Sequence, residues 1–147
     1  MLLNVPSVLS PELLMALDMM GHGDEIVIAD SNYPALRMAR ECTVKEPIYV
    51  KGAGVPEVLD AVLTMIPLDY LEQESVIGVK APPERGPQPI HAEYPKVLAK
   101  HGYGAERLGM VSKADFYARA KDAFCVVVTG ESATFANMIV RKGVVKN

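Results

Sequence analysis

The chain has little of several features that mark particular classes of protein. It contains no tryptophan, three phenylalanines and two cysteines among 147 residues. Cys42 and Cys125 stand far apart in apolar or mixed segments, which gives neither a disulfide framework nor a zinc-binding spacing, so both thiols are expected to be reduced. The net charge is only −3 and no basic cluster occurs, which argues against nucleic acid as a partner.

Long hydrophobic runs are also missing. The longest ones, such as residues 26–29 and 124–128, fall far short of the roughly 20 residues that cross a bilayer. The N-terminus has no positive residue before its apolar stretch, so it does not predict a secretory signal. We therefore expect no membrane partner and a cytoplasmic location. With 50% hydrophobic residues, the chain has enough apolar mass for a single core, and one domain over residues 1–147 is expected.

Segments with strand character alternate with segments of helical periodicity. Strands are predicted at residues 25–29, 47–51, 75–81, 108–111 and 124–129, and helices at residues 11–20, 55–66, 90–102 and 113–123. A turn at residues 130–132 then leads to a last apolar segment, residues 137–141. This alternation predicts an α/β fold, a single layered domain with a largely parallel central sheet flanked by helices. Its ligand site is expected beyond the carboxyl ends of the strands.

Histidine 22 has the most distinctive surroundings of the three histidines. His22 lies between Gly21 and Gly23 in a turn before a buried strand, and glycine on both sides leaves room for a ligand to approach the imidazole. A helix that ends at Gly21, followed by a solvated His22, accounts for the same residues equally well. His91 and His101 flank a predicted surface helix and are expected to be solvated.

Two charged residues are expected at the ligand edge of the sheet. Asp30 directly follows the strand at residues 25–29, and Lys113 follows another strand and opens a helix, so both can point into one crevice. His22 with Asp24 or Asp30 lacks a third ligand at a familiar spacing, so no metal is expected. The glycine turn at residues 52–54 departs from the dinucleotide fingerprint, because Glu57 replaces its third glycine, and no nucleotide cofactor is expected.

Two blocks of the sequence are similar to a known family. Residues 10–14 (Ser-Pro-Glu-Leu-Leu), residues 20–26 (Met-Gly-His-Gly-Asp-Glu-Ile) and Asp30 with Pro34 and Ala35 resemble the opening of the RbsD/FucU sugar mutarotase family, nearer to its L-fucose mutarotase branch. A second block agrees in family order: residues 116–117, 119–120, 129–131, 137 and 142–144. The resemblance implies an α/β subunit in a ring-like homo-oligomer, typically a decamer, that interconverts the anomers of a free monosaccharide without a cofactor.

The resemblance also implies roles for individual residues. By analogy His22 is the proton donor, Asp30 holds sugar hydroxyls, and Lys113 stands where relatives have Arg or His. The closing substrate segment is Phe135, Ala136 and Asn137. Relatives usually carry tyrosine at the first of these three positions, so Phe135 removes a hydroxyl from the pocket. Two alternatives stay open: a D-ribose pyranase-type activity, and a non-enzymatic monosaccharide-binding or transport-accessory protein.

Overall fold

The computed structural model describes residues 1–146, and a six-stranded sheet forms its centre. The strands are β1 (Glu25–Ala29), β2 (Ile48–Val50), β3 (Val76–Val79), β4 (Leu108–Val111), β5 (Cys125–Thr129) and β6 (Met138–Arg141), in the order β2-β5-β1-β6-β3-β4. The pairs β1–β5, β2–β5 and β3–β4 are parallel. β1 lies near the middle, and all five of its residues are buried. The predicted α/β class with a largely parallel sheet is confirmed.

One strand runs against the others. β6 pairs antiparallel with both β1 and β3, with Val27 opposite Ile139 and Gly78 opposite Met138. Only residues 130–137 join β5 to β6, and this connection is too short for the crossover of a dozen or more residues that a parallel neighbour requires. The antiparallel direction places the residues before β6 at the same edge of the sheet as the residues after β1.

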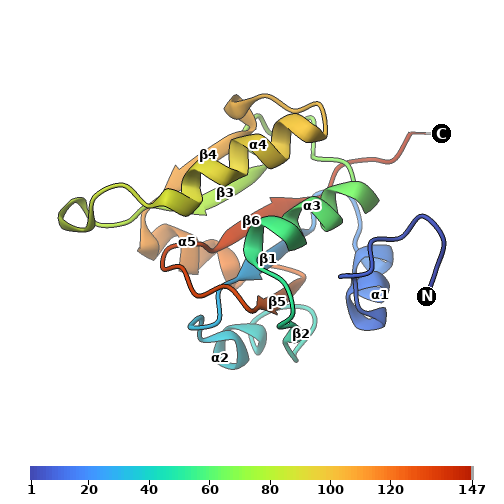
Figure 1. Ribbon diagram of the computed structural model, residues 1–147. Coiled ribbons are helices and arrows are strands. Elements are labelled where there is room, and N and C mark those ends of the chain that lie inside the picture. Colours follow the sequence, from blue (N-terminus) through green and yellow to red (C-terminus); the bar gives the residue numbers. More distant parts are fainter. Residues whose placement is uncertain (147) are drawn as a thin grey trace.

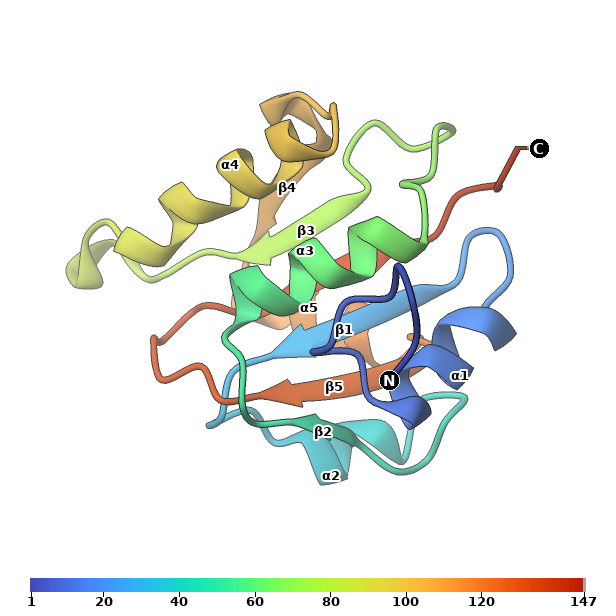
Figure 2. The ribbon, with the colours of Figure 1, turned by 45° about the vertical axis from the view of Figure 1, so that its right-hand side comes forward.

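Helices cover both faces of the sheet (Figures 1 and 2). The core on one face includes side chains from α1 (Pro11–Met19), α3 (Val55–Met65) and α4 (Glu93–Lys100). The core on the other face includes side chains from α2 (Ala35–Ala39) and α5 (Lys113–Ala120). Because strand side chains alternate, Ile26 and Ile28 of β1 enter the first core, whereas Val27 and Ala29 enter the second.

Local signals account for the helix starts. Ser10 Oγ accepts a hydrogen bond from the Leu13 amide at 3.2 Å, and Pro11 stands in the first turn of α1. Ser112 Oγ caps α5 in the same way by accepting from the Asp115 amide at 3.1 Å. α5 is thereby fixed to begin at Lys113, directly after β4.

The structure differs from the predicted elements in four short segments. The helix expected over residues 90–102 is a 3₁₀ turn, η2 (Pro89–Ala92), followed by α4. Two further 3₁₀ turns, η1 (Pro83–Arg85) and η3 (Ala105–Arg107), and the five-residue α2 were not predicted, since segments this short carry no readable period. No helix within residues 1–146 is both long and apolar enough to cross a membrane.

Candidate active site

A pocket of about 190 Å³ opens at the carboxyl edge of the sheet. In Figure 2 the arrowheads of β1, β3 and β5 point to this side, where the segment between β5 and β6 also lies. The pocket is lined by Asp30, Asn32, Tyr33, Val79, Arg85, Lys113, Tyr117, Thr134, Phe135 and Asn137. Four of the residues predicted for the site, Asp30, Lys113, Phe135 and Asn137, therefore come together here.

The end of β1 and the start of β6 are joined through Asp30 and Asn137. The Asp30 amide donates to Asn137 Oδ1 at 2.7 Å, which leaves the two amide hydrogens of Asn137 as donors for a carboxylate or a ligand hydroxyl. The Asn32 amide donates to Asp30 Oδ1 at 2.9 Å. Burial raises the pKa of Asp30, because desolvation of the carboxylate outweighs the hydrogen bonds from Asn32 and Asn137. The pocket therefore holds a buried acceptor next to an amide donor.

Aromatic rings form another wall of the pocket. Tyr33 and Tyr117 have ring centroids 5.3 Å apart, and Lys113 Nζ lies 5.7 Å from the centroid of the Tyr117 ring. The Tyr33 hydroxyl is buried and has no hydrogen-bond partner within the described residues 1–146. Such a group costs about 1–3 kcal/mol relative to a paired one. Rings beside hydrogen-bonding groups are suited to a sugar, which has an apolar ring face and polar hydroxyls.

The segment that closes the pocket carries backbone strain. Phe135 adopts a left-handed backbone conformation with φ of 59°, which costs a non-glycine residue about 1–2 kcal/mol. Phe135 lines the pocket, whereas Ala136 is fully buried and does not line it. Strain of this kind persists only where surrounding contacts hold it, and it is concentrated at functional sites.

His22 does not lie in this pocket. It sits in the turn between α1 and β1, at the opposite edge of the sheet, where the Gly23 amide donates to the Lys142 carbonyl beyond the end of β6. Residues 25 to 30 alone span about 16 Å at the rise of an extended strand. His22 and Asp30 therefore do not share a site within one chain, because the two residues stand before and after the same central strand.

His22 instead forms a pair with a buried carboxylate. His22 Nε2 lies 2.9 Å from Asp69 Oδ1, and Asp69 is fully buried while the His22 side chain is 36% exposed. Because an ionised carboxylate only accepts, Nε2 carries the proton, and in the neutral ring Nδ1 is the free acceptor. The ring of Tyr70 lies parallel to the imidazole, with centroids 6.1 Å apart. This arrangement fixes both the tautomer and the plane of His22.

Charged hydrogen bonds hold Asp69 as an anion. Arg141 Nε donates to Asp69 Oδ2 at 2.7 Å, and the Leu71 amide donates to Oδ1 at 3.0 Å. Burial by itself would raise the pKa of Asp69, but these bonds and the one from His22 outweigh it and lower the pKa to about 2. Next to it, Arg119 donates to both carboxylate oxygens of Glu25. Asp69 is therefore ionised where it accepts the hydrogen bond from His22 Nε2.

The sequence analysis missed several residues that the structure places at these two edges. Tyr33, Arg85 and Tyr117 line the pocket, and Asp69 partners His22. Asp69 lies 47 residues from His22 in the chain, and no local pattern links the two. The position of Tyr33 is a weak indication of a place in the site, because it follows Asp30 in the loop after a buried strand.

The expectation that His91 and His101 are solvated is wrong. His91 Nε2 lies 2.8 Å from the Phe135 carbonyl oxygen, and His101 Nε2 lies 2.6 Å from Asp60 Oδ1. Both partners are distant in the sequence, and a periodicity argument for a surface helix does not detect such contacts.

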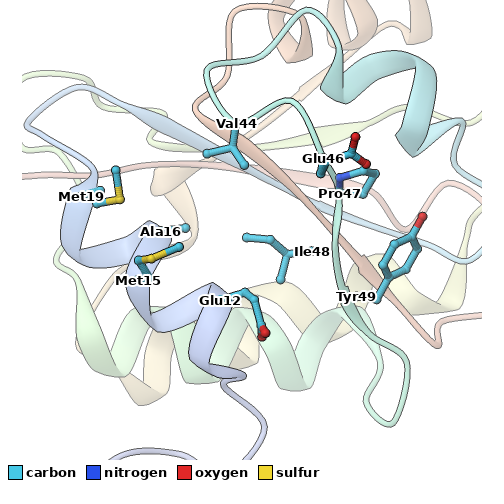
Figure 3. Close-up of a pocket in the computed structure, with 9 residues that line it drawn as sticks. All are labelled: Glu12, Met15, Ala16, Met19, Val44, Glu46, Pro47, Ile48 and Tyr49. Atoms are coloured by element: carbon cyan, nitrogen blue, oxygen red, sulfur yellow. The ribbon is translucent and has the colours of Figure 1, made fainter.

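A second polar hollow, of about 390 Å³, lies beside the turn that carries His22, and Glu25, Arg119 and Arg141 are among its lining residues. Across residues 1–146, side chains of His, Cys, Asp and Glu form no group of three that could hold a metal ion. A larger hollow of about 460 Å³ lies between α1 and β2 (Figure 3), where Met15, Met19 and Ile48 form much of its surface. Its charged groups are Glu12 and Glu46 alone, so it offers a ligand no cation and no imidazole.

Comparison with known proteins identifies the family. Residues 3–145 match the model of the RbsD / FucU transport protein family. The chain belongs to the RbsD/FucU family. It is 47% identical over 145 residues to the fucose mutarotase of Homo sapiens, which covers 96% of this chain and 92% of that protein. It is 34% identical to the L-fucose mutarotase of Haemophilus influenzae, over 98% of this chain and 97% of that one.

A solved structure of the family has the same fold. The crystal structure of the fucose mutarotase from Streptococcus pneumoniae in complex with L-fucose matches with a TM-score of 0.91 and 36% identity, covering 99% of this chain and 100% of that one. The resemblance to the RbsD/FucU family predicted from the two sequence blocks is thus confirmed, and it extends over the full subunit.

Proposed function

We propose that the protein is a mutarotase that interconverts the α and β anomers of a free monosaccharide, L-fucose or a related aldose, by acid/base ring opening. The observation that carries this proposal is the pairing of His22 with the buried Asp69, in a chain whose relatives are fucose mutarotases. Ring opening requires a proton on the ring oxygen and loss of a proton from the anomeric hydroxyl. Both steps need only proton transfer, for which an imidazole near neutral pH is suited.

In this proposal the two edges of the sheet have different roles. His22 is the proton donor, and Asp69 orients its ring and stabilises the imidazolium. Asp30 accepts hydrogen bonds from sugar hydroxyls, while Asn137 and Lys113 donate to them. Phe135, Ala136 and Asn137 form the closing segment, and the Phe135 ring packs against the sugar. The groups named need neither a metal nor a cofactor for this chemistry.

His22 and Asp30 can act on one sugar only if they come from two copies of the chain. They lie at opposite edges of the sheet, separated by the length of β1, and a monosaccharide is much shorter than this strand. The complete site is therefore proposed to form where the His22 edge of one subunit meets the pocket of its neighbour. Exposed apolar residues near the His22 edge suit such a contact, among them Met19, Tyr70 and Leu71.

This pairing is heterologous, since two different surfaces of the subunit meet. A repeated heterologous contact closes into a ring when the rotation between subunits permits it. A ring-like homo-oligomer is the form we propose, and the decamer is the size that the resemblance to the family implies. The free, buried thiols of Cys42 and Cys125 suit the reducing cytoplasm, which we propose as the location.

Exchange NMR of the anomeric protons of L-fucose and D-ribose, with and without the protein, tests the function. Accelerated α/β exchange of L-fucose is expected, and it should vanish in His22→Gln but persist in the matched variant His101→Gln. Acceleration on D-ribose alone would favour the pyranase-type activity. Shifted sugar signals without faster exchange would identify a binding protein instead, and the proposal would then be wrong.

A further inference from the structure

The backbone of the closing segment is held by two side chains that lie outside the pocket. His91 Nε2 lies 2.8 Å from the Phe135 carbonyl oxygen, and the Tyr94 hydroxyl donates to the Ala136 carbonyl at 2.6 Å. The two successive carbonyls are thus bound by residues three apart, at the junction of η2 and α4. Neither His91 nor Tyr94 lines the pocket.

The geometry of these bonds determines the chemical state of His91. A carbonyl oxygen only accepts, so Nε2 of His91 carries a proton and donates it. Tyr94 is fully buried, and burial raises the pKa of its hydroxyl, so this group stays a donor. The rings of the two residues lie near each other, with centroids 6.2 Å apart. Both donors are therefore set in place before any sugar arrives.

These donors act on the strained part of the chain. Phe135 has φ of 59°, a conformation that non-glycine residues leave unless other contacts enforce it. The next residue but one, Asn137, accepts from the Asp30 amide at 2.7 Å. A change of backbone at Phe135 would therefore move its ring, the Asn137 amide and the connection to Asp30 together.

We propose that His91 and Tyr94 are positioning residues for the sugar, which hold Phe135 in its left-handed conformation so that the Phe135 ring and the Asn137 amide face the pocket. This inference rests on the proposed sugar site, but His91 and Tyr94 do not line that site. In this proposal, two residues at the start of α4 affect sugar affinity although they contact the closing segment from the side that faces away from the pocket. The Pro-rich loop that carries Arg85 runs directly into these two residues.

The proposal predicts that removal of the His91 donor weakens substrate binding more than the chemical step. His91→Leu should raise the KM of L-fucose exchange about three- to tenfold, as expected for a lost hydrogen bond, with a smaller change in kcat. His91→Gln should restore most of the wild-type KM, because its amide nitrogen can donate where Nε2 does. Tyr94→Phe should act like His91→Leu on KM.

A matched control separates positioning from general loss of stability. His101→Leu removes the histidine contact to Asp60 at the other end of α4, and it should leave KM unchanged even where it lowers the melting temperature. Equal KM values for wild type and His91→Leu would overturn the proposal. An equal rise of KM in His91→Leu and His91→Gln would also overturn it, because the donor would then not be the property that counts.

A measurement without sugar keeps this inference separate from the proposed function. Hydrogen exchange of the Asp30 amide, which donates to Asn137, should be faster in His91→Leu and near wild type in His91→Gln. If the wild-type protein acts on no sugar, the proposed function is wrong, and this amide still decides whether His91 holds the segment. Unchanged Asp30 protection in His91→Leu would contradict the positioning role in either case.

Discussion

Asp30 and Asp69 are both buried carboxylates, yet they lie in opposite electrostatic environments. Asp69, beside His22, is hydrogen-bonded to Arg141 and has its pKa lowered to about 2. Asp30, in the pocket, has its pKa raised by burial and receives only neutral hydrogen bonds among the contacts described. The charge of Asp69 is thus balanced by contacts within the chain. The pocket instead holds a carboxylate with neutral partners, a strained phenylalanine, and a tyrosine hydroxyl that has no partner in residues 1–146.

This difference separates stability from binding in space. The network at Asp69 stabilises the fold and orients the His22 ring, whereas the unsatisfied and strained groups of the pocket lower the stability of the free protein. Substitutions at the two edges should therefore have different signatures, and each of the following changes tests one side of the comparison.

The largest effect is expected on catalysis at His22. His22→Gln should lower the anomer exchange rate at saturating sugar by about 100-fold or more, the usual contribution of a positioned acid/base group. The unfolding free energy should change little, because the His22 side chain is partly exposed and glutamine can still donate to Asp69. Exchange NMR and denaturant unfolding measure the two quantities. A wild-type exchange rate in this variant would remove His22 from the mechanism.

The largest effect on stability is expected at Asp69. Asp69→Asn removes the carboxylate that Arg141 binds at 2.7 Å and leaves it the longer contact to Glu25 at 3.5 Å, so the unfolding free energy should fall by about 3 kcal/mol. Asp60→Asn is the matched control, since Asp60 pairs with Lys100 and His101 at a partly exposed site and should cost under about 1 kcal/mol. Equal losses of unfolding free energy in the two variants would show that the buried Asp69 network contributes no more to stability than the partly exposed Asp60 pairs.

The same carboxylate gives a pH dependence with a definite sign. A lowered pKa contributes stability above the unfolded value of 3.8, and this contribution is lost as the pH falls through about 2. The unfolding free energy of the wild type should therefore fall more steeply between pH 4 and 2 than that of Asp69→Asn. Parallel pH profiles for the two proteins would contradict the assignment.

At Asp30 the sign is reversed. A carboxyl group whose pKa is raised on folding disfavours the folded state above that pKa, and its cost disappears as the pH falls below the unfolded value. Asp30→Asn should therefore keep or raise the unfolding free energy at pH 7 while it weakens L-fucose binding by about tenfold or more. Calorimetric titration and thermal melting check both parts. A destabilised variant with unchanged affinity would make Asp30 a structural residue.

The smallest effect is expected at Tyr33. Tyr33→Phe removes a buried hydroxyl that has no partner among residues 1–146, so the unfolding free energy should rise by up to about 1 kcal/mol. Tyr94→Phe makes the same chemical change where the hydroxyl is bonded to Ala136, and it should lower the unfolding free energy by about that amount. Opposite signs in the two variants are the expected result, and a loss in both would contradict it.

Much of the fold could be predicted from local patterns, whereas half of the site could not. Periodicity placed residues 25–29 and 55–66 in a strand and a helix, and the position of Asp30 after a buried strand predicted its place at the ligand edge. The antiparallel direction of β6 was not predicted, although the connection from β5 is too short for a parallel crossover. His22 contacts Asp69, and His91 contacts the Phe135 carbonyl. Both contacts join segments that are distant in the sequence, so no local pattern predicts them.

Mixing two impaired variants is the most direct test of a site shared between subunits. At a sugar concentration below KM, His22→Gln impairs the chemical step and Asp30→Asn impairs binding in every site of their own oligomers, but a mixed oligomer contains interfaces where an intact His22 edge meets an intact pocket. After unfolding and refolding of an equal mixture, roughly a quarter of the wild-type exchange rate should return, because subunits combine at random around the ring. If the mixture shows only the mean exchange rate of its two components although mixed oligomers form, His22 and Asp30 do not act together across a subunit boundary.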